Sequence, residues 1–272
     1  MALPHILLLT GTPPGESGVG GIYLLELCRN YPSDRLSCLV LGSSGSTRGQ
    51  LPLPGVEVGY LARPYDQLWR AGIGKIGGLT ALSRFLWARL FREQTIIEQA
   101  LAFAREQRPE MVWGVLNHPT LYRIAPRLAA RLDVPLVATI WDPPEQVAWN
   151  LDLDRVSLGL AARDLLNAVR VSERCSVMSE AMRDHYESAT GTPCTIMRYG
   201  VDPAPAVRTG SPAGEADCFV LGFAGSLSAE DTWHALLRAL ASVGWRIAGR
   251  RVMLRVFARE LVLEARGSMR ID

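Results

Sequence analysis

The chain has 272 residues, 48% of them hydrophobic and 21% charged, with a formal net charge of +2. These proportions are ordinary for a globular protein, and so small a charge gives no reason to expect a nucleic acid or an acidic partner. Its five cysteines are scattered, without a CxxC pair or a Cys/His cluster. Neither a disulfide framework nor a metal site is indicated, and the cytoplasm is the expected compartment.

Short apolar runs alternate with segments of helical periodicity through the first two hundred residues. The expected strands are Ile6–Thr10, Leu36–Leu41, Val56–Leu61, Met111–Val115, Val134–Ile140, Cys175–Met178 and Thr195–Arg198. Five helices are expected. One starts at Gly20 or Gly21, one lies within Ile76–Glu106, two cover Thr120–Leu132 and Leu158–Val171, and the last starts at Ser179. This alternation predicts an α/β fold whose parallel sheet has helices on both faces and binds ligands at the carboxyl ends of its strands.

A second α/β unit follows a stretch with three prolines and two glycines, residues 203–215, which is typical of a linker. Phe219–Ala224 and Val252–Phe257 are expected to be strands on either side of a helix beginning at Ser228. We predict a first domain over residues 1–204, a linker over 205–217 and a truncated second domain over 218–272. Such a domain would expose apolar strand surface that a protein partner could cover.

The loop between the first predicted strand and helix is rich in glycine, running GTPPGESGVGG from Gly11 to Gly21. Glycines allow backbone amides to approach a ligand closely, and a helix N-terminus favours a phosphate group. The loop lacks the Lys-Ser/Thr of a P-loop and the third glycine of a nicotinamide-cofactor fingerprint. The alternative, in which these glycines serve only the turn, stays open.

Three stretches, in this order, resemble the family-4 retaining glycosyltransferases of the GT-B fold. They are Gly18–Leu27, the pair Cys175–Met182 and Met197–Asp202, and Leu221–Ser228. The resemblance covers most of residues 4–258 and implies two Rossmann-like domains. It also implies transfer of a sugar, with retention, from a nucleotide-diphosphate sugar to a glycan or lipid-linked acceptor, without a bound metal or other cofactor.

The resemblance implies roles for individual residues but names no nucleophile or base. The donor-binding residues would be Gly18, Gly20, Gly21, Gly225 and Ser226. Trp141 and Asp142, at the carboxyl end of a predicted strand, would line the acceptor side. The alternatives are half-buried packing for Trp141 and a turn-shaping role for Asp142, which precedes two prolines.

The sequence departs from the family pattern where the second domain begins. The family usually carries Arg after the glycine of this segment and Lys five residues later, whereas this chain has Ser226 and Asp231. The family's paired glutamates, which hold the donor, have no counterpart. A noncatalytic remnant or binding module without a working donor site is therefore the alternative function.

Residues 69–92 combine five cations with four aromatic side chains and contain no acidic residue. A basic amphipathic surface of this kind can rest on anionic lipid, which would place the protein at the inner face of a membrane. The alternative is a helix packed on the core with a solvated basic face.

Overall fold

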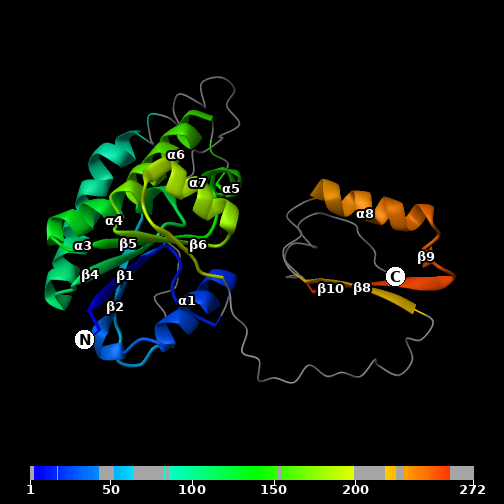
Figure 1. Cartoon of the computed structure of the whole chain (residues 1–272), viewed down its shortest axis with the longest axis horizontal. Helices are drawn as coiled ribbons and strands as arrows, with labels where there is room; N and C mark the ends of the chain where they lie inside the picture. The colour runs from blue at the N-terminus through cyan, green and yellow to red at the C-terminus, as the bar shows by residue number, and fades with distance from the viewer. Residues whose placement is uncertain are drawn as a thin grey trace. The chain divides into compact units, whose positions relative to one another are not determined.

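The computed structural model describes residues 3–16, 18–42, 52–63, 83, 86–151, 153, 155–198, 218–224 and 230–257 (Figure 1). The chain divides into two compact units, Met1–Val201 and Asp202–Asp272. The predicted linker and the predicted donor residues Gly225 and Ser226 lie outside the described residues.

Unit 1 is built on a seven-stranded sheet with the order β3-β2-β1-β4-β5-β6-β7, in which every neighbouring pair is parallel. The strands are β1 Ile6–Thr10, β2 Leu36–Gly42, β3 Glu57–Ala62, β4 Met111–Val115, β5 Leu136–Ile140, β6 Arg174–Val177 and β7 Cys194–Ile196. Both β1 and β2 are buried along their whole length, as expected of central parallel strands. From β1 the chain adds β2 and β3 on one side of the sheet and then β4 to β7 on the other. This change of side creates a topological switch point between the carboxyl ends of β1 and β4.

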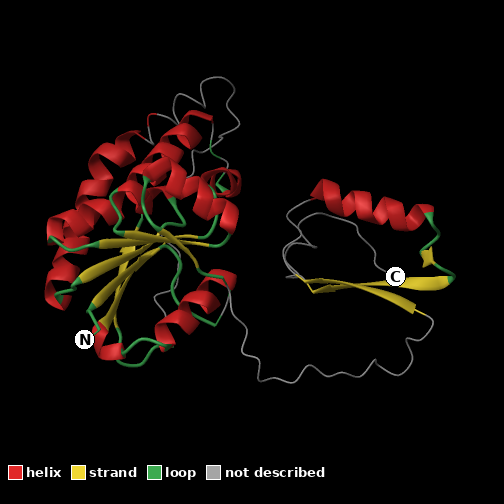
Figure 2. Cartoon of the chain, viewed as in Figure 1, coloured by secondary structure: helices red, strands yellow, loops and turns green. Residues whose placement is uncertain are grey.

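The helices of unit 1 cover the two faces of the sheet unequally. They are α1 Val19–Arg29, α3 Glu93–Gln107, α4 Pro119–Leu132, α5 Pro144–Asn150, α6 Arg155–Arg170 and α7 Glu180–Thr190, with a short helix η1 at Ser33–Arg35. Figure 2 shows α3 to α7 on one face and α1 on the other. Two buried clusters result, a larger one under α3, α4 and α6 and a smaller one between α1 and the sheet.

The predicted strands of unit 1 all form, with ends that differ by at most two residues from those expected. Helix α5 was not predicted, because the pair Pro143-Pro144 indicates a turn; proline is nevertheless tolerated in a first helical turn, where its missing N–H has no intrahelical partner. The long helix expected within Ile76–Glu106 contains a π-helical segment, η2 Ala88–Arg92, directly before α3. Residues 76–82 of that expectation lie outside the described residues.

Unit 2 has a three-stranded sheet with one helix against it. Its elements are β8 Cys218–Ala224, α8 Glu230–Ser242, β9 Arg246–Ile247 and β10 Arg250–Phe257. Strand β10 pairs in parallel with β8 and antiparallel with the unpredicted β9. Trp233 of α8 is buried against Phe223 of β8, with ring centroids 5.4 Å apart.

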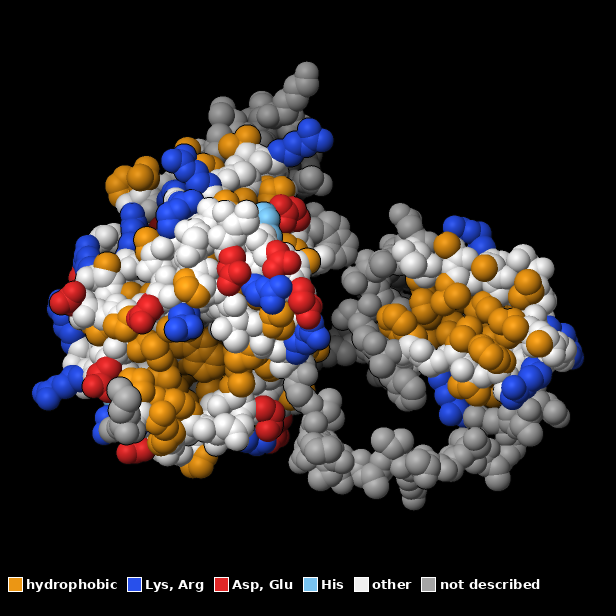
Figure 3. Space-filling model, in the orientation of Figure 1, with side chains coloured by type: hydrophobic (Ala, Val, Ile, Leu, Met, Phe, Trp, Pro, Cys, Tyr) orange, Lys and Arg blue, Asp and Glu red, His pale blue; other side chains and the backbone are white. Residues whose placement is uncertain are grey.

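The exposed apolar surface expected on the strands of unit 2 is present only in part. Phe219 is 39% exposed, whereas Val252 is 5% exposed. Figure 3 shows further hydrophobic side chains gathered on the visible face of this unit. Among the described residues of both units, no helix is both long and apolar enough to cross a membrane.

Candidate functional site

Side chains connect the carboxyl ends of β1, β3 and β4 at the switch point. Asn117, after β4, donates from Nδ2 to Oγ1 of Thr12, after β1, at 3.0 Å. A Cβ atom added at Gly11 would lie 2.9 Å from Oδ1 of Asn117 and 3.5 Å from Nη1 of Arg63, which follows β3. Glycine at position 11 therefore allows an amide and a guanidinium to approach the backbone at the end of β1. Oδ1 of Asn117 has no hydrogen-bond partner among the described residues.

The predicted donor loop and a predicted acceptor residue are in direct contact. A Cβ atom at Gly20 would lie 2.6 Å from Cζ3 of Trp141, so the indole ring lies directly against the start of α1. Tyr23, three residues further along α1, makes an edge contact with Trp141, with centroids 6.1 Å apart and planes at 71°. The Tyr23 hydroxyl donates to the Met197 carbonyl at 3.3 Å. The start of α1 is thus attached to the ends of β5 and β7.

The other two predicted donor glycines have structural roles in the same loop. Gly18 precedes α1 with φ +72°, a conformation that glycine adopts at little cost. A Cβ atom at Gly21 would lie 3.2 Å from the Pro13 carbonyl oxygen, and the Gly21 carbonyl accepts the Gly15 N–H at 3.0 Å. These contacts account for Gly18 and Gly21 as parts of a tight loop. Contact of these glycines with a sugar donor stays a prediction.

Charged residues follow β5, β6 and β7 at the same edge of the sheet. Asp142 lies beside Trp141 with an exposed side chain, yet nearby protein atoms remove part of its hydration and raise the pKa of its carboxyl group. Arg198 donates to both carboxylate oxygens of Glu180. A hydrogen bond from the Glu180 backbone, followed by the Arg198 interactions, lowers the pKa of Glu180. Ser179 caps α7 by accepting the Met182 N–H at 3.3 Å.

His118 is a buried residue at the N-terminal end of α4, next to Asn117. Burial, followed by repulsion from Arg63 and Arg123, holds the pKa of His118 well below its usual value. The imidazole is therefore neutral at neutral pH.

Acidification below about pH 6.5 is expected to destabilise the protein through His118. Folding lowers the pKa of His118 from its unfolded value near 6.5. Below that pH the unfolded chain therefore binds more protons than the folded chain, and the free energy of unfolding decreases as the pH is lowered. The slope contributed by one residue reaches about 1.4 kcal/mol per pH unit. Urea unfolding at several values between pH 7 and pH 5 should show this slope. It should decrease in His118→Gln and persist in His185→Gln, which changes an exposed histidine of α7.

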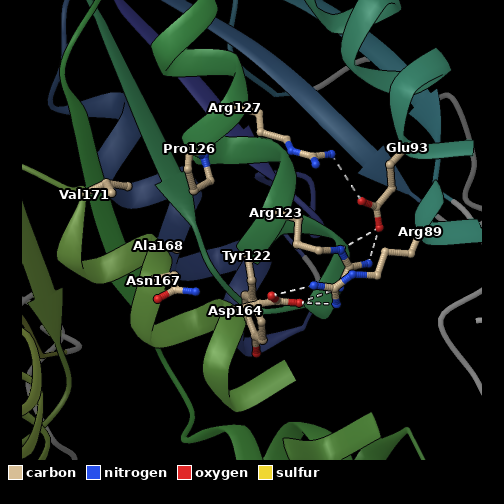
Figure 4. Close-up of a pocket in the computed structure, with 10 residues that line it drawn as sticks. All are labelled: Arg89, Glu93, Tyr122, Arg123, Pro126, Arg127, Asp164, Asn167, Ala168 and Val171. Atoms are coloured by element: carbon tan, nitrogen blue, oxygen red, sulfur yellow. Dashed lines mark hydrogen bonds and ion pairs between the residues drawn. The ribbon is translucent and has the colours of Figure 1, made fainter. Parts of the chain in front are cut away.

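A network of buried charges lies behind the site, beside a cavity of about 240 Å³ between α3, α4 and α6 (Figure 4). Arg123 donates to Glu93 and, at 3.2 Å, to Asp164. Arg89 donates to both oxygens of Asp164 at 2.6 and 2.9 Å. Nη1 of Arg127 lies 3.8 Å from Oε2 of Glu93. None of the residues predicted for the site lines this cavity. The buried charged side chains that do line it form ion pairs with one another.

The structure brings Gly18, Gly20, Gly21, Trp141 and Asp142 together at one edge of the sheet. Asn117 lies at the carboxyl end of a predicted strand, where ligands are expected, whereas neither Arg63 nor the contact of Tyr23 with Trp141 was predicted. The position of Arg63 directly after a strand was the available signal. No group of three or more His, Cys, Asp or Glu side chains that could hold a metal ion occurs in the described part of the chain.

No protein-family model matches the chain, and no curated protein matches it. Solved structures do resemble it in fold. HepE from Anabaena, in complex with UDP-glucose, is 15% identical with a TM-score of 0.50, over 93% of this chain and 69% of HepE. UGT71G1 from Medicago truncatula, complexed with UDP-glucose, is 10% identical with a TM-score of 0.50, over 95% of this chain and 68% of its own length.

A third structure, the glycotransferase of kitacinnamycin, is 15% identical with a TM-score of 0.50, over 94% of this chain and 66% of that one. The chain therefore spans about two thirds of the length of these three structures. These neighbours are GT-B glycosyltransferases, and this chain has the α/β fold of that class. The likeness is one of fold, and the closer resemblance to family 4 stays a prediction.

Proposed function

We propose that the chain belongs to a glycosyltransferase that takes a sugar from a nucleotide-diphosphate sugar. The observation that carries this proposal is the contact between Gly20 and Trp141 at the carboxyl edge of a GT-B-type sheet. Ligands of such sheets bind at this edge, and HepE and UGT71G1, which resemble the chain in fold, were solved with UDP-glucose. Retention of configuration and a glycan or lipid-linked acceptor rest on the sequence resemblance.

The proposed chemistry divides the carboxyl edge into two parts. The start of α1 offers backbone N–H groups and the positive end of the helix dipole, which suit the anionic donor. Gly225 and Ser226 of unit 2 are proposed as further donor contacts. Trp141 offers an aromatic ring, and Asp142 and the unpartnered Oδ1 of Asn117 offer acceptors for sugar hydroxyl groups. Charge on the leaving diphosphate is to be stabilised by hydrogen-bond donors and cations, without a metal.

A binding module without catalysis is the second candidate. Ser226 and Asp231 stand where the resembling family carries Arg and Lys, so two cations for the leaving diphosphate are replaced, one of them by an anion. A partner protein could supply the cations that the donor site lacks in this chain.

Incubation with a panel of nucleotide sugars, UDP-glucose among them, and a set of glycan and lipid-linked acceptors tests the two candidates. We expect release of the nucleoside diphosphate together with a mass increase of one acceptor by one sugar unit. Saturable binding of a sugar or nucleotide without release of the diphosphate would favour the binding module. Failure of every nucleotide sugar and acceptor to bind would contradict both.

We also propose that the segment around η2 rests on an anionic membrane surface. Of its described apolar side chains, Trp87 is 54% exposed, Phe91 60% and Leu90 68%. Trp87 and Phe91 lie together with ring centroids 6.4 Å apart, and the guanidinium carbon of Arg92 is 6.0 Å from the Trp87 ring centroid. These exposed side chains favour the membrane surface over the alternative of a helix packed on the core. Aromatic and cationic groups side by side suit the interface of an anionic bilayer.

Co-sedimentation with liposomes that contain anionic lipid tests this surface. We expect the wild-type chain to sediment and the double variant Trp87→Ala, Phe91→Ala to lose most of that binding. Phe219→Ala, which removes an exposed aromatic side chain of unit 2, is the matched control and should sediment as the wild type does. Equal binding by the wild type and the double variant would remove these residues as anchors.

A further inference from the structure

A second cavity lies on the face of the sheet that α1 covers. Its volume is about 400 Å³, and it runs from the end of α1 across β4, β5, β6 and β7. We call it the α1-side groove. Apolar and aromatic side chains form most of its lining, among them Leu27, Tyr31, Met111, Trp113 and Val137. Figure 3 shows hydrophobic side chains gathered between α1 and the sheet of unit 1.

Several polar side chains in and behind the walls of this groove are already hydrogen-bonded within the protein. The Trp113 indole N–H donates to Oγ1 of Thr139 at 2.8 Å, and that oxygen lies 2.6 Å from Oγ of Ser176. The Tyr31 hydroxyl donates to the Pro4 carbonyl at 2.5 Å. Burial raises the pKa of the Cys28 thiol to about 12, so this lining group is neutral. The walls therefore offer a ligand mainly carbon surface, and a polar ligand would gain few hydrogen bonds there.

Arg174 is the exception among the lining residues. It is the first residue of β6, and its side chain is exposed. Among the described residues that line the groove, it alone carries a charge. Within the described residues it forms no ion pair, unlike Arg89 and Arg123, whose charges are balanced by carboxylates. An unbalanced guanidinium beside an apolar groove is complementary to a ligand with one anionic end and an apolar body.

We propose that the α1-side groove binds a single-chain carboxylic acid, with the alkyl chain along the groove and the carboxylate on Arg174. The volume lies in the range of small-molecule sites, about 300–1,000 Å³, which combine apolar walls with a few placed polar groups. The groove reaches the carboxyl edge at Met197, but its other lining residues are not among those proposed for glycosyl transfer, and the proposal does not depend on that activity.

Isothermal titration of the whole chain with octanoate, decanoate and dodecanoate, each below its micelle concentration, tests the site. Affinity should rise about fourfold per added CH₂ group, the change that corresponds to about 0.8 kcal/mol of buried methylene. Arg174→Gln should weaken decanoate binding about tenfold and leave binding of neutral decanol unchanged. Arg170→Gln, which removes an exposed cation of α6 outside the groove, should bind decanoate as the wild type does.

A second variant separates the groove from other apolar surface. Thr195→Trp places a large side chain on the exposed edge strand β7, where it would fill the groove, and should abolish binding of both decanoate and decanol. Circular dichroism of each variant establishes that the fold is retained. Affinity that is independent of chain length, unchanged in Arg174→Gln, or unchanged in Thr195→Trp would overturn the proposal, as would the absence of saturable binding to the wild type.

Discussion

Replacing Arg123 by methionine is expected to lower the free energy of unfolding by about 3–5 kcal/mol, the largest stability effect that we expect of a single change. Arg123 contacts both Glu93 and Asp164 and is itself buried. Without it, Arg127, at 3.8 Å, would be the one cation among the described residues left beside the fully buried carboxylate of Glu93. An uncompensated charge in the interior is costly because it has lost its hydration without gaining a partner.

Urea unfolding, monitored by circular dichroism, measures the effect, and Arg127→Met provides the matched control. The Arg127 side chain is 56% exposed, so its loss should cost no more than about 1 kcal/mol. Combining Arg123→Met with Glu93→Leu should recover much of the loss, because Asp164 then keeps its two hydrogen bonds from Arg89 and Glu93 no longer leaves a buried charge unpaired. Equal losses in the two single variants would show that the network does not depend on Arg123.

Replacing Gly20 by valine is expected to displace Trp141 and to weaken binding of the nucleotide sugar at least tenfold. A Cβ atom at this position would lie 2.6 and 2.9 Å from two carbon atoms of the indole, and a branched side chain needs still more room. Overpacking of this kind costs about 1–3 kcal/mol of stability. The ring, the start of α1 and the Tyr23 contact would all have to move, although no proposed ligand-binding side chain has been removed.

The control for this change is Gly159→Ala. Gly159 lies in α6 with no atom within 4 Å of an added Cβ, and alanine is the better helix former there by about 0.5–1 kcal/mol. It should stabilise the chain and leave ligand binding unaltered. If Gly20→Val bound a nucleotide sugar as tightly as the wild type, the Gly20–Trp141 contact would have no part in the donor site.

The alternation of apolar runs and helical segments was sufficient to predict the parallel sheet of unit 1, since runs such as Ile6–Thr10 and Met111–Val115 are too short for helices and too apolar for surface strands. Elements whose formation depends on context were missed. Pro143 and Pro144 indicate a turn, yet Pro144 begins α5. The two-residue strand β9 has no periodicity to detect and forms through pairing with β10.

In the candidate site, too, residues marked by a local pattern were predicted, whereas contacts between distant residues were missed. Their positions after a predicted strand pointed to Trp141 and Asp142, because parallel strands place their carboxyl ends at one edge. The packing of Trp141 on Gly20 joins residues more than a hundred positions apart, which no local pattern reveals. Arg63 was missed for the same reason: only the sheet order brings the end of β3 close to the end of β1.

The most direct test of the central claim uses the Trp141 indole as a reporter of ligand binding. Its Nε1 has no hydrogen-bond partner among the described residues, whereas the Trp113 indole donates to Thr139 and serves as an internal control. In nitrogen-15 spectra assigned with Trp141→Phe and Trp113→Phe, UDP-glucose or another nucleotide sugar should shift the Trp141 signal saturably and leave that of Trp113 in place. A Trp141 signal unmoved by every nucleotide sugar tested would contradict the proposed donor site beside Gly20.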